Sequence, residues 1–277
     1  MQQAREKADL LVQAIKYISK FADKIVVVKY GGNAMEDEKL KESVFEDIAM
    51  LSRLGLKIVV VHGGGPKIDE ETKKNGIDKK IIHGLRVTDG QTLAIIEKVF
   101  ERINDDCARH LNKHGLSAID CTQGTLITEI TDERLGFVGE IKQVNTQPII
   151  AALNKGKVPV LSSLGADKTG QLTNINADTA ASKIAVALQA EKLTVLTNVD
   201  SVVDADGRRI SHISAHHAEQ YIMSGVINSG MIPKVKACID AAEHGVKKAH
   251  LLNGTTPRAL LIEIFTDQGI GTELVKS

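Results

Sequence analysis

The segment Ile58-Val59-Val60-Val61-His62-Gly63-Gly64-Gly65-Pro66-Lys67-Ile68 is an apolar run that ends in three glycines and a proline. Four consecutive branched residues predict a strand that is buried on both faces, as in a parallel sheet. The glycines let the backbone turn sharply and approach a ligand, and Pro66 suits the first turn of a helix. A helix N-terminus offers unpaired N–H donors, so the pattern predicts an anion site at the end of this strand. A plain tight turn is the alternative interpretation.

A second copy of this pattern lies earlier in the chain, at Lys24-Ile25-Val26-Val27-Val28-Lys29-Tyr30-Gly31-Gly32-Asn33. Lys29 stands at the strand end just before the glycines, where a fixed ammonium group can face the same anion. Neither turn has the spacing G-x-x-x-x-G-K-[ST] of a P-loop or G-x-G-x-x-G of a dinucleotide site. The pair therefore predicts a phosphate site of another kind and argues against a dinucleotide-dependent oxidoreductase.

Length and charge narrow the class of protein. A chain of 277 residues can form one large α/β domain or two closely packed lobes. Lys and Arg total 35, as do Asp and Glu, so there is no basic excess to indicate a nucleic-acid partner. The N-terminus lacks the apolar core of a signal peptide, and no apolar run is long enough to span a bilayer, so we expect a cytoplasmic protein without a membrane partner. The three cysteines, Cys107, Cys121 and Cys238, are widely spaced and are expected to be reduced core residues.

The remaining chain alternates between helical and strand patterns. Apolar residues recur at helical spacing in residues 10–22, 40–54 and 93–111. Residues 117–144 are instead short, alternating and rich in Thr and Gly, which predicts a β-hairpin insertion near the substrate. Beyond it, strands are predicted at 158–161, 193–197 and 249–252, a turn at 165–171, a helix entered through 172–178, and further helices at 215–223, 233–243 and 257–265. The predicted fold is α/β, an open and mainly parallel sheet with helices on both faces.

In such a sheet a ligand lies across the carboxyl ends of the strands, so Lys29 and the glycine turns are expected to converge. Asp178 lies near a helix start, where it either caps the helix or interacts with the helix dipole, or else holds lysines in place. Lys234 follows a proline at another helix start, and an ordinary solvated lysine is the alternative interpretation. The nearby histidines 212, 216 and 217 could imitate a metal cluster, but without a carboxylate pattern a surface helix is favoured.

Five motifs, in order along almost the whole chain, resemble the amino-acid kinase family, in particular its members that phosphorylate N-acetyl-L-glutamate. They are KYGGN at 29–33, HGGGP at 62–66, GLRVT at 84–88, NINAD at 174–178 and GMIPK at 230–234. The resemblance implies an amino-acid kinase fold in one domain, 1–277, with an oligomerisation helix at 1–22. It further implies an N-terminal lobe at about 23–173 that binds acetylglutamate and a C-terminal lobe at about 174–277 that binds ATP.

The implied activity is transfer of phosphate from ATP to the γ-carboxylate of N-acetyl-L-glutamate, the second step of arginine biosynthesis, with Mg²⁺ bridging the ATP phosphates and no metal ligands from the protein. A carboxylate is already ionised at neutral pH, so positioning and positive charge are needed rather than a general base. By resemblance, the catalytic residues are Lys29, Lys234 and Asp178. The acceptor would be bound by Gly64, Gly65, Arg86, Asn174 and Asn176, and the phosphoryl group by Gly31, Gly32 and Gly64.

The nucleotide pocket departs from the family pattern. Members often have Thr-Asp-Val-x-Gly after the strand at 193–197, whereas Thr197-Asn198-Val199-Asp200-Ser201 here replaces both the acid and the glycine. The resemblance implies that the nucleotide contacts are made by Asn198, Val199, Asp200 and Val203.

The two chain ends resemble those of the arginine-inhibited members. An N-terminal helix that links dimers into a hexamer is implied, together with L-arginine as a feedback inhibitor and a PII nitrogen-signalling protein as a further candidate partner. The arginine contacts would be Tyr17, Glu263, Gly269 and Gly271, whereas a terminal helix followed by a glycine turn is the structural alternative. A kinase for glutamate, aspartate, carbamate or a nucleotide is the main competing function, against which the Arg86 motif argues. A non-catalytic arginine sensor would have lost the lysines.

Overall fold

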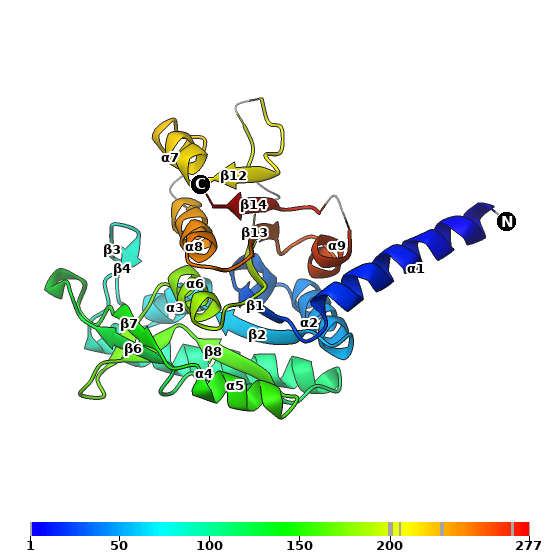
Figure 1. Cartoon of the computed structure of the whole chain (residues 1–277). Coiled ribbons are helices and arrows are strands. Elements are labelled where there is room, and N and C mark those ends of the chain that lie inside the picture. Colours follow the sequence, from blue (N-terminus) through cyan, green and yellow to red (C-terminus); the bar gives the residue numbers. More distant parts are fainter. Residues whose placement is uncertain (1, 199–201, 205, 228–229, 267–268, 277) are drawn as a thin grey trace.

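The computed structural model describes residues 2–198, 202–204, 206–227, 230–266 and 269–276. Within them an eight-stranded sheet has the order β12-β14-β13-β11-β1-β2-β8-β5 (Figure 1). Neighbouring strands of this sheet pair in parallel, except that β13 and β14 are antiparallel. This confirms the predicted α/β fold with a mainly parallel sheet. The strands are β1 (Ile25–Tyr30), β2 (Lys57–His62), β5 (Ala118–Asp120), β8 (Val158–Ser162), β11 (Lys192–Thr197), β12 (His212–Ser214), β13 (Lys248–Asn253) and β14 (Thr272–Val275).

The two strands that precede the glycine turns lie side by side in the middle of this sheet. β1 and β2 are in parallel register from Ile25 opposite Lys57 to Tyr30 opposite His62, so both turns leave the same edge together. Successive β1 side chains enter different cores. Val27 packs in a first hydrophobic core on one face of the sheet, whereas Val28 packs in a second core on the opposite face. Burial on both faces is the reason for the continuous apolar runs.

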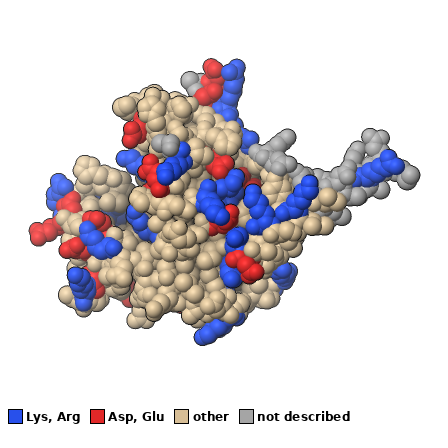
Figure 2. Space-filling view, in the orientation of Figure 1, with Lys and Arg blue, Asp and Glu red and all other residues tan. Residues whose placement is uncertain are grey.

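Helices cover both faces of the sheet. The first core is covered by α5 (Gln147–Asn154), α6 (Ala177–Ala187), α7 (Ala215–Met223) and α8 (Ile232–Glu243). The second is covered by α2 (Glu38–Arg53), α3 (Gly65–Lys74), α4 (Gly90–Lys113) and α9 (Ala259–Phe265). The first helix, α1 (Gln2–Phe21), projects from the body and contacts α9 at its base (Figure 1). Positive and negative side chains are interspersed over the face drawn in Figure 2, as the balanced composition leads one to expect.

The prediction of a β-hairpin insertion at 117–144 is wrong for residues 118–120, which form β5 of the main sheet. It is confirmed for β6 (Leu126–Glu129) and β7 (Glu140–Val144), which pair in antiparallel fashion within a second sheet. The order of this second sheet is β10-β9-β6-β7, and its other strands are β9 (Leu164–Ala166) and β10 (Leu172–Asn174). The prediction that residues 172–178 enter a helix directly is wrong for the first three, because they pair with β9, and α6 begins only at Ala177. The predicted turn at 165–171 is wrong for Gly165 and Ala166, which belong to β9, and strands β12 and β14 were also not predicted. The predicted boundary between lobes, at residues 173 and 174, falls within β10 and stays a prediction.

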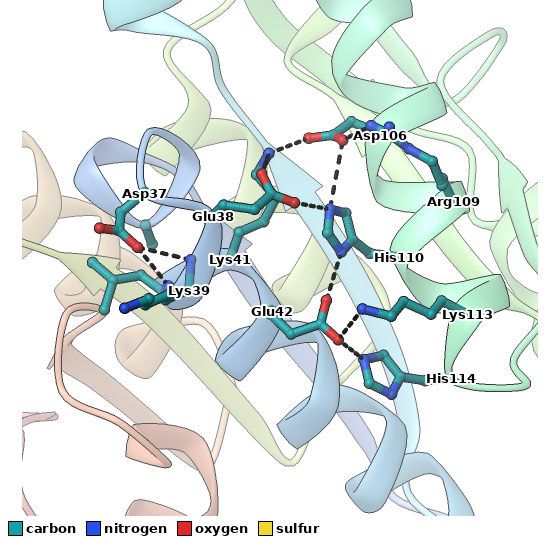
Figure 3. A network of polar contacts seen from close by, with 12 residues as sticks. Asp37, Glu38, Lys39, Lys41, Glu42, Asp106, Arg109, His110, Lys113 and His114 are labelled. Atoms are coloured by element: carbon teal, nitrogen blue, oxygen red, sulfur yellow. Dashed lines mark hydrogen bonds and ion pairs between the residues drawn. The ribbon is translucent and has the colours of Figure 1, made fainter.

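A partly buried polar network links α2 to α4 (Figure 3). Lys41 Nζ lies 2.9 Å from Glu38 and 2.8 Å from Asp106, while His110 lies 3.1 Å from Glu42 and stacks on a Phe45 ring 5.3 Å away. Because α4 also supplies side chains that pack behind the second glycine turn, this network holds one wall of the site described below.

Some expectations concern absences or helix caps. The three cysteines are free and buried, as predicted. In the part of the chain that the structure describes, no helix has both the length and the apolar character needed to cross a membrane, and no cluster of His, Cys, Asp or Glu is suited to a metal ion. Thr88 and Gln91 have the spacing of a capping box, which predicts Thr88 as the cap of α4, but Asp89 caps this helix instead, by accepting a hydrogen bond from Thr92 N at 2.8 Å.

Candidate active site

Both glycine turns open into one cavity of about 330 Å³ at the carboxyl ends of β1 and β2. Every residue predicted from the resemblance to act in catalysis, acceptor binding or phosphoryl binding lines it. These residues are Lys29, Gly31, Gly32, Gly64, Gly65, Arg86, Asn174, Asn176, Asp178 and Lys234. The structure therefore places together residues from five separate motifs, and their individual roles stay predictions.

The charged centre of the cavity is one carboxylate between two ammonium groups. Lys29 Nζ lies 3.0 Å from Asp178 Oδ1, and Lys234 Nζ lies 2.8 Å from Asp178 Oδ2. Burial opposes the charge of Asp178, but the two lysines outweigh it and hold the pKa of this carboxyl below its usual range. Burial also lowers the pKa of Lys29, against the attraction of Asp178. The group thus carries a net positive charge, held in place by the central carboxylate.

Asp178 owes its position to the start of α6. Asn176 caps this helix, since its side-chain oxygen accepts hydrogen bonds from Asp178 N at 2.9 Å and Thr179 N at 3.1 Å. The alternative in which Asp178 itself is the cap is therefore wrong. In the first helical turn the dipole further favours its negative charge. Lys234 likewise sits in the first turn of α8, just after Pro233.

At two positions of the glycine turns, a larger side chain would require its neighbours to move. At Gly32, where φ is +70°, a Cβ would lie 2.5 Å from Asn198 Oδ1. A Cβ at Gly64 would lie 2.9 Å from Ile103 Cδ1 and 3.0 Å from Phe100. By contrast, a Cβ at Gly65 would meet nothing within 4 Å and would intrude only on the cavity. Gly64 begins α3 without a side-chain cap bond, so the first N–H groups of that helix suit an anion.

Two further polar side chains line the cavity, the guanidinium of Arg86 and the amide of Asn174. Arg86 ends the hairpin of β3 (Ile81–Ile82) and β4 (Leu85–Arg86), and its guanidinium forms an ion pair with Asp69 of α3. Asn174 Nδ2 donates to Thr88 Oγ1 at 3.1 Å, and Thr88 Oγ1 donates to Arg86 O at 2.9 Å. With Arg86 and the lysine pair in one cavity, the arrangement suits a molecule that carries two anionic groups.

Several lining residues were not predicted. They include Lys79, Phe100, Val138 and Ser163. His62 was quoted only as part of a motif, yet it is fully buried, with Nε2 2.6 Å from Asn104 Oδ1 and Nδ1 3.0 Å from Gly63 O. Burial lowers the pKa of His62, and the side chain braces the second glycine turn. Its signal in the sequence was a polar residue at the end of an otherwise apolar strand.

The predicted nucleotide contacts are only partly described. Asn198 lies against Gly32, beside the cavity. Val203 is 43% exposed, pairs with Arg209 and does not line the cavity. Val199 and Asp200 lie outside the described residues. The four assignments stay predictions.

The four predicted arginine contacts share a second cavity, of about 260 Å³, between the base of α1 and the β13–β14 edge. Tyr17, Glu263, Gly269 and Gly271 all line it. Glu263 is buried there, with Oε1 2.9 Å from Lys192 Nζ and 3.0 Å from His250 Nε2, while Oε2 accepts a hydrogen bond from Gly271 N at 3.2 Å. Burial opposes its charge, but His250 and Lys192 outweigh it and hold the pKa of Glu263 well below the usual range.

Replacing Glu263 with Gln is expected to lower the free energy of unfolding at pH 7 by about 3 kcal/mol, because Lys192 would keep its buried charge without a partner. The folded pKa of Glu263 is depressed, so its contribution is present above the unfolded pKa of about 4.3 and is lost as pH falls through the folded value. Urea unfolding of wild type and E263Q at pH 7, 5 and 3.5 should therefore show a difference in the free energy of unfolding that shrinks below about pH 4.

The control is E191Q, which breaks the more exposed 2.9 Å pair with Lys247 and should lower the free energy of unfolding by less than about 1 kcal/mol at each pH. A pH-independent E263Q effect would contradict the ionic account.

The chain is similar to known proteins in both sequence and structure. Residues 24–253 match the model of the amino acid kinase family. The chain is 43% identical over 294 aligned residues to the acetylglutamate kinase of Pelobacter propionicus, covering 100% of both chains. It is 44% identical to the acetylglutamate kinase of Caldanaerobacter subterraneus, covering 98% of this chain and 93% of that one.

Solved structures share the fold. N-acetylglutamate synthase from Neisseria gonorrhoeae, complexed with coenzyme A and N-acetyl-glutamate, has a TM-score of 0.89 at 26% identity. The match covers 98% of this chain but only 63% of the synthase chain. The same synthase complexed with coenzyme A and L-arginine gives a TM-score of 0.85 at 25% identity, covering 98% of this chain and 65% of that one. Carbamate kinase from Giardia lamblia, at 18% identity and a TM-score of 0.69 over 92% of this chain and 99% of that one, supports the fold alone.

Proposed function

The chain belongs to the amino acid kinase family, and from this premise we propose that it transfers the γ-phosphoryl group of ATP to the side-chain carboxylate of N-acetyl-L-glutamate, in arginine biosynthesis. The observation that carries the proposal is the pairing of Lys29 and Lys234 on Asp178 in the same cavity as Arg86. We also propose a cytoplasmic location for this reaction.

The chemistry needs no general base. An oxygen of the ionised γ-carboxylate forms the new bond to the γ-phosphorus, the bond from that phosphorus to the bridging oxygen breaks, and negative charge moves onto ADP. Lys29 and Lys234 stabilise charge on the transferring group and on the leaving phosphate. At about 4 Å and an effective dielectric near 20, one such contact has a Coulomb scale of about 4 kcal/mol. The negative charge of Asp178 offsets the repulsion between the two ammonium groups, so both stay in position before the substrates bind.

The two glycine turns supply further contacts to the phosphoryl group, in addition to those made by the lysines. Backbone N–H groups at Gly32 and Gly64 lie at the strand ends and suit the equatorial phosphoryl oxygens. Among the described residues that line the cavity the one carboxylate is Asp178, and both of its oxygens face lysines. We propose that Mg²⁺ accompanies ATP and assign no side chain of the described residues to it; when bound, it would supply charge neutralisation.

The part of the cavity that would bind the acceptor suits a substrate whose amino group is acetylated. Arg86 can bind the α-carboxylate through two N–H groups, and the Asn174 amide lies beside it. The remaining lining includes Leu85, Val138 and Ile175. An apolar wall in a cavity with several cations disfavours a free α-ammonium group, whereas a neutral acetamido group fits this environment. The site therefore favours N-acetyl-L-glutamate over glutamate.

Trapping of the acyl phosphate with hydroxylamine tests this function. With Mg-ATP, hydroxamate should form with N-acetyl-L-glutamate and not with L-glutamate or L-aspartate. Equal product from free glutamate would indicate a different member of the family, and the absence of product from folded, ATP-binding protein would overturn the proposal.

We further propose that L-arginine inhibits the enzyme by binding in the cavity lined by Tyr17, Glu263, Gly269 and Gly271, and that the protein is a hexamer built as a trimer of dimers through α1. Two carboxylates that line this cavity, Glu263 and Glu273, suit a guanidinium or an ammonium group. The relative with bound L-arginine has the same fold. Val12 and Ile15 of α1 are 55% and 59% exposed, as expected for a helix that contacts another subunit.

Deletion of the residues before Asp23 should therefore leave dimers and weaken arginine inhibition, because it removes both the α1 contact and Tyr17. Light scattering gives the mass, and hydroxamate formation at increasing arginine gives the inhibition. A V12D/I15D double variant keeps Tyr17 and should lose the hexamer in the same way. A truncated protein that remained hexameric would refute this assembly.

A further inference from the structure

Asp69 stands behind the acceptor side of the active site and contacts two cations at once. It lies on α3, the helix that begins at the second glycine turn. Its Oδ1 forms an ion pair with the Arg86 guanidinium, and its Oδ2 lies 2.8 Å from Lys79 Nζ. Burial opposes the Asp69 charge, but Lys79 and Arg86 outweigh it and hold the pKa of this carboxyl below its usual range. Asp69 itself does not line the cavity, whereas both of its partners do.

The two cations come from opposite arms of one small hairpin. Lys79 precedes β3, Arg86 ends β4, and Ile81 pairs with Arg86 across the hairpin. Val87 N also donates to Lys80 O at 3.0 Å. A single carboxylate on α3 therefore fixes the base of the hairpin relative to the glycine turn. Each strand of the hairpin has only two residues, so the backbone pairing between the strands contributes little to its stability.

The contact with Asp69 leaves Arg86 able to bind a ligand. The ion pair is made by one terminal nitrogen, Nη2. A guanidinium has five N–H donors, so the remaining donors can still grip a second carboxylate with two bonds. Asp69 therefore does not compete with an acceptor for Arg86. Lys79, with a side chain 49% exposed, adds a second positive charge to the same wall.

We propose that Asp69 is a positioning residue that holds Arg86 and Lys79 together as a two-cation grip, and that Lys79 is a further specificity residue for the α-carboxylate of the acceptor. This inference rests on the proposed function, because it assigns part of the acceptor site of that reaction. It predicts that loss of Asp69 or Lys79 raises KM for the acceptor and leaves kcat and KM for ATP nearly unchanged.

The test compares D69N and K79M with wild type on two acceptors. One is N-acetyl-L-glutamate and the other is 4-acetamidobutanoate, which has the same chain and acetyl group but lacks the α-carboxylate. For N-acetyl-L-glutamate, KM should rise about 10-fold in D69N and about 3-fold or more in K79M. For 4-acetamidobutanoate, kcat/KM should stay within about 2-fold of wild type in both variants. Isothermal titration of N-acetyl-L-glutamate should show the same weakening without turnover.

E70Q and K74M are the matched controls, because they break the exposed 2.7 Å pair on the same helix and away from the cavity. They should leave both acceptors unaffected. Equal losses with the two acceptors, a fall in kcat alone, or an unchanged KM for N-acetyl-L-glutamate would each overturn the positioning inference. Failure of wild type to phosphorylate N-acetyl-L-glutamate would instead overturn the proposed function, so the two failures are distinguishable.

Discussion

An Asp178→Asn variant is expected to lose at least about 10³-fold in kcat, the upper scale for loss of a preorganised electrostatic group. Asp178 is 4% exposed and contacts Lys29 at 3.0 Å and Lys234 at 2.8 Å. An amide cannot neutralise either ammonium group, so the two would repel each other and Lys29 would shed its proton more readily. The variant would lack both the geometry and part of the charge on which transfer depends.

The same substitution should also destabilise the fold, by about 3 kcal/mol, because it leaves Lys29 buried without its partner. Steady-state kinetics and urea unfolding measure the two effects. D240N is the matched control, since Asp240 ties α8 to α6 through Lys183 at 2.8 Å without lining the cavity of about 330 Å³. It should keep kcat within about 3-fold of wild type. A D178N enzyme with nearly normal kcat would show that the lysines do not need this carboxylate.

A Lys234→Met variant is expected to lose at least about 10²-fold in kcat with a folded structure and little change in acceptor KM. Lys234 is partly exposed to the cavity, with 22% of its side-chain surface accessible, so its loss removes a charge that meets the phosphoryl group. Asp178 would still be paired with Lys29, which keeps the buried carboxylate neutralised.

K236M is the control for this substitution, because Lys236 lies two residues further along α8, is exposed and does not line the active-site cavity. Its kcat should match wild type. If K234M lost less than about 5-fold in kcat, Lys234 would be a solvated surface lysine, the alternative that the sequence left open.

The central part of the fold was predictable because its signals are local. The runs before the glycine turns at Gly31 and Gly63 are apolar since both faces of β1 and β2 are buried, and this alone distinguishes a parallel sheet. Strands β12 and β14 were missed because they have three and four residues and exist only through pairing with distant neighbours at the sheet edge. Such short segments carry no periodicity that could identify them.

The active site was predictable where motifs carry it and not where tertiary contacts do. Lys29, Asp178 and Lys234 stand next to strand ends or helix starts, so their convergence follows from the topology of the sheet. Asp69 and Lys79 carry no comparable signal. Asp69 is one of several charged residues on α3, and Lys79 lies in an irregular segment. Their contact depends on how the hairpin packs against α3.

The most direct test of carboxylate phosphorylation is an oxygen-tracing experiment. The enzyme would turn over ATP and N-acetyl-L-glutamate labelled with ¹⁸O in its γ-carboxylate, hydroxylamine would trap the product, and the released phosphate would be examined by ³¹P NMR. Attack of the carboxylate on phosphorus predicts one ¹⁸O atom in every phosphate released from the acyl phosphate and none in ADP. Phosphate without ¹⁸O would show that water, and not the acceptor carboxylate, receives the phosphoryl group, and it would contradict this account.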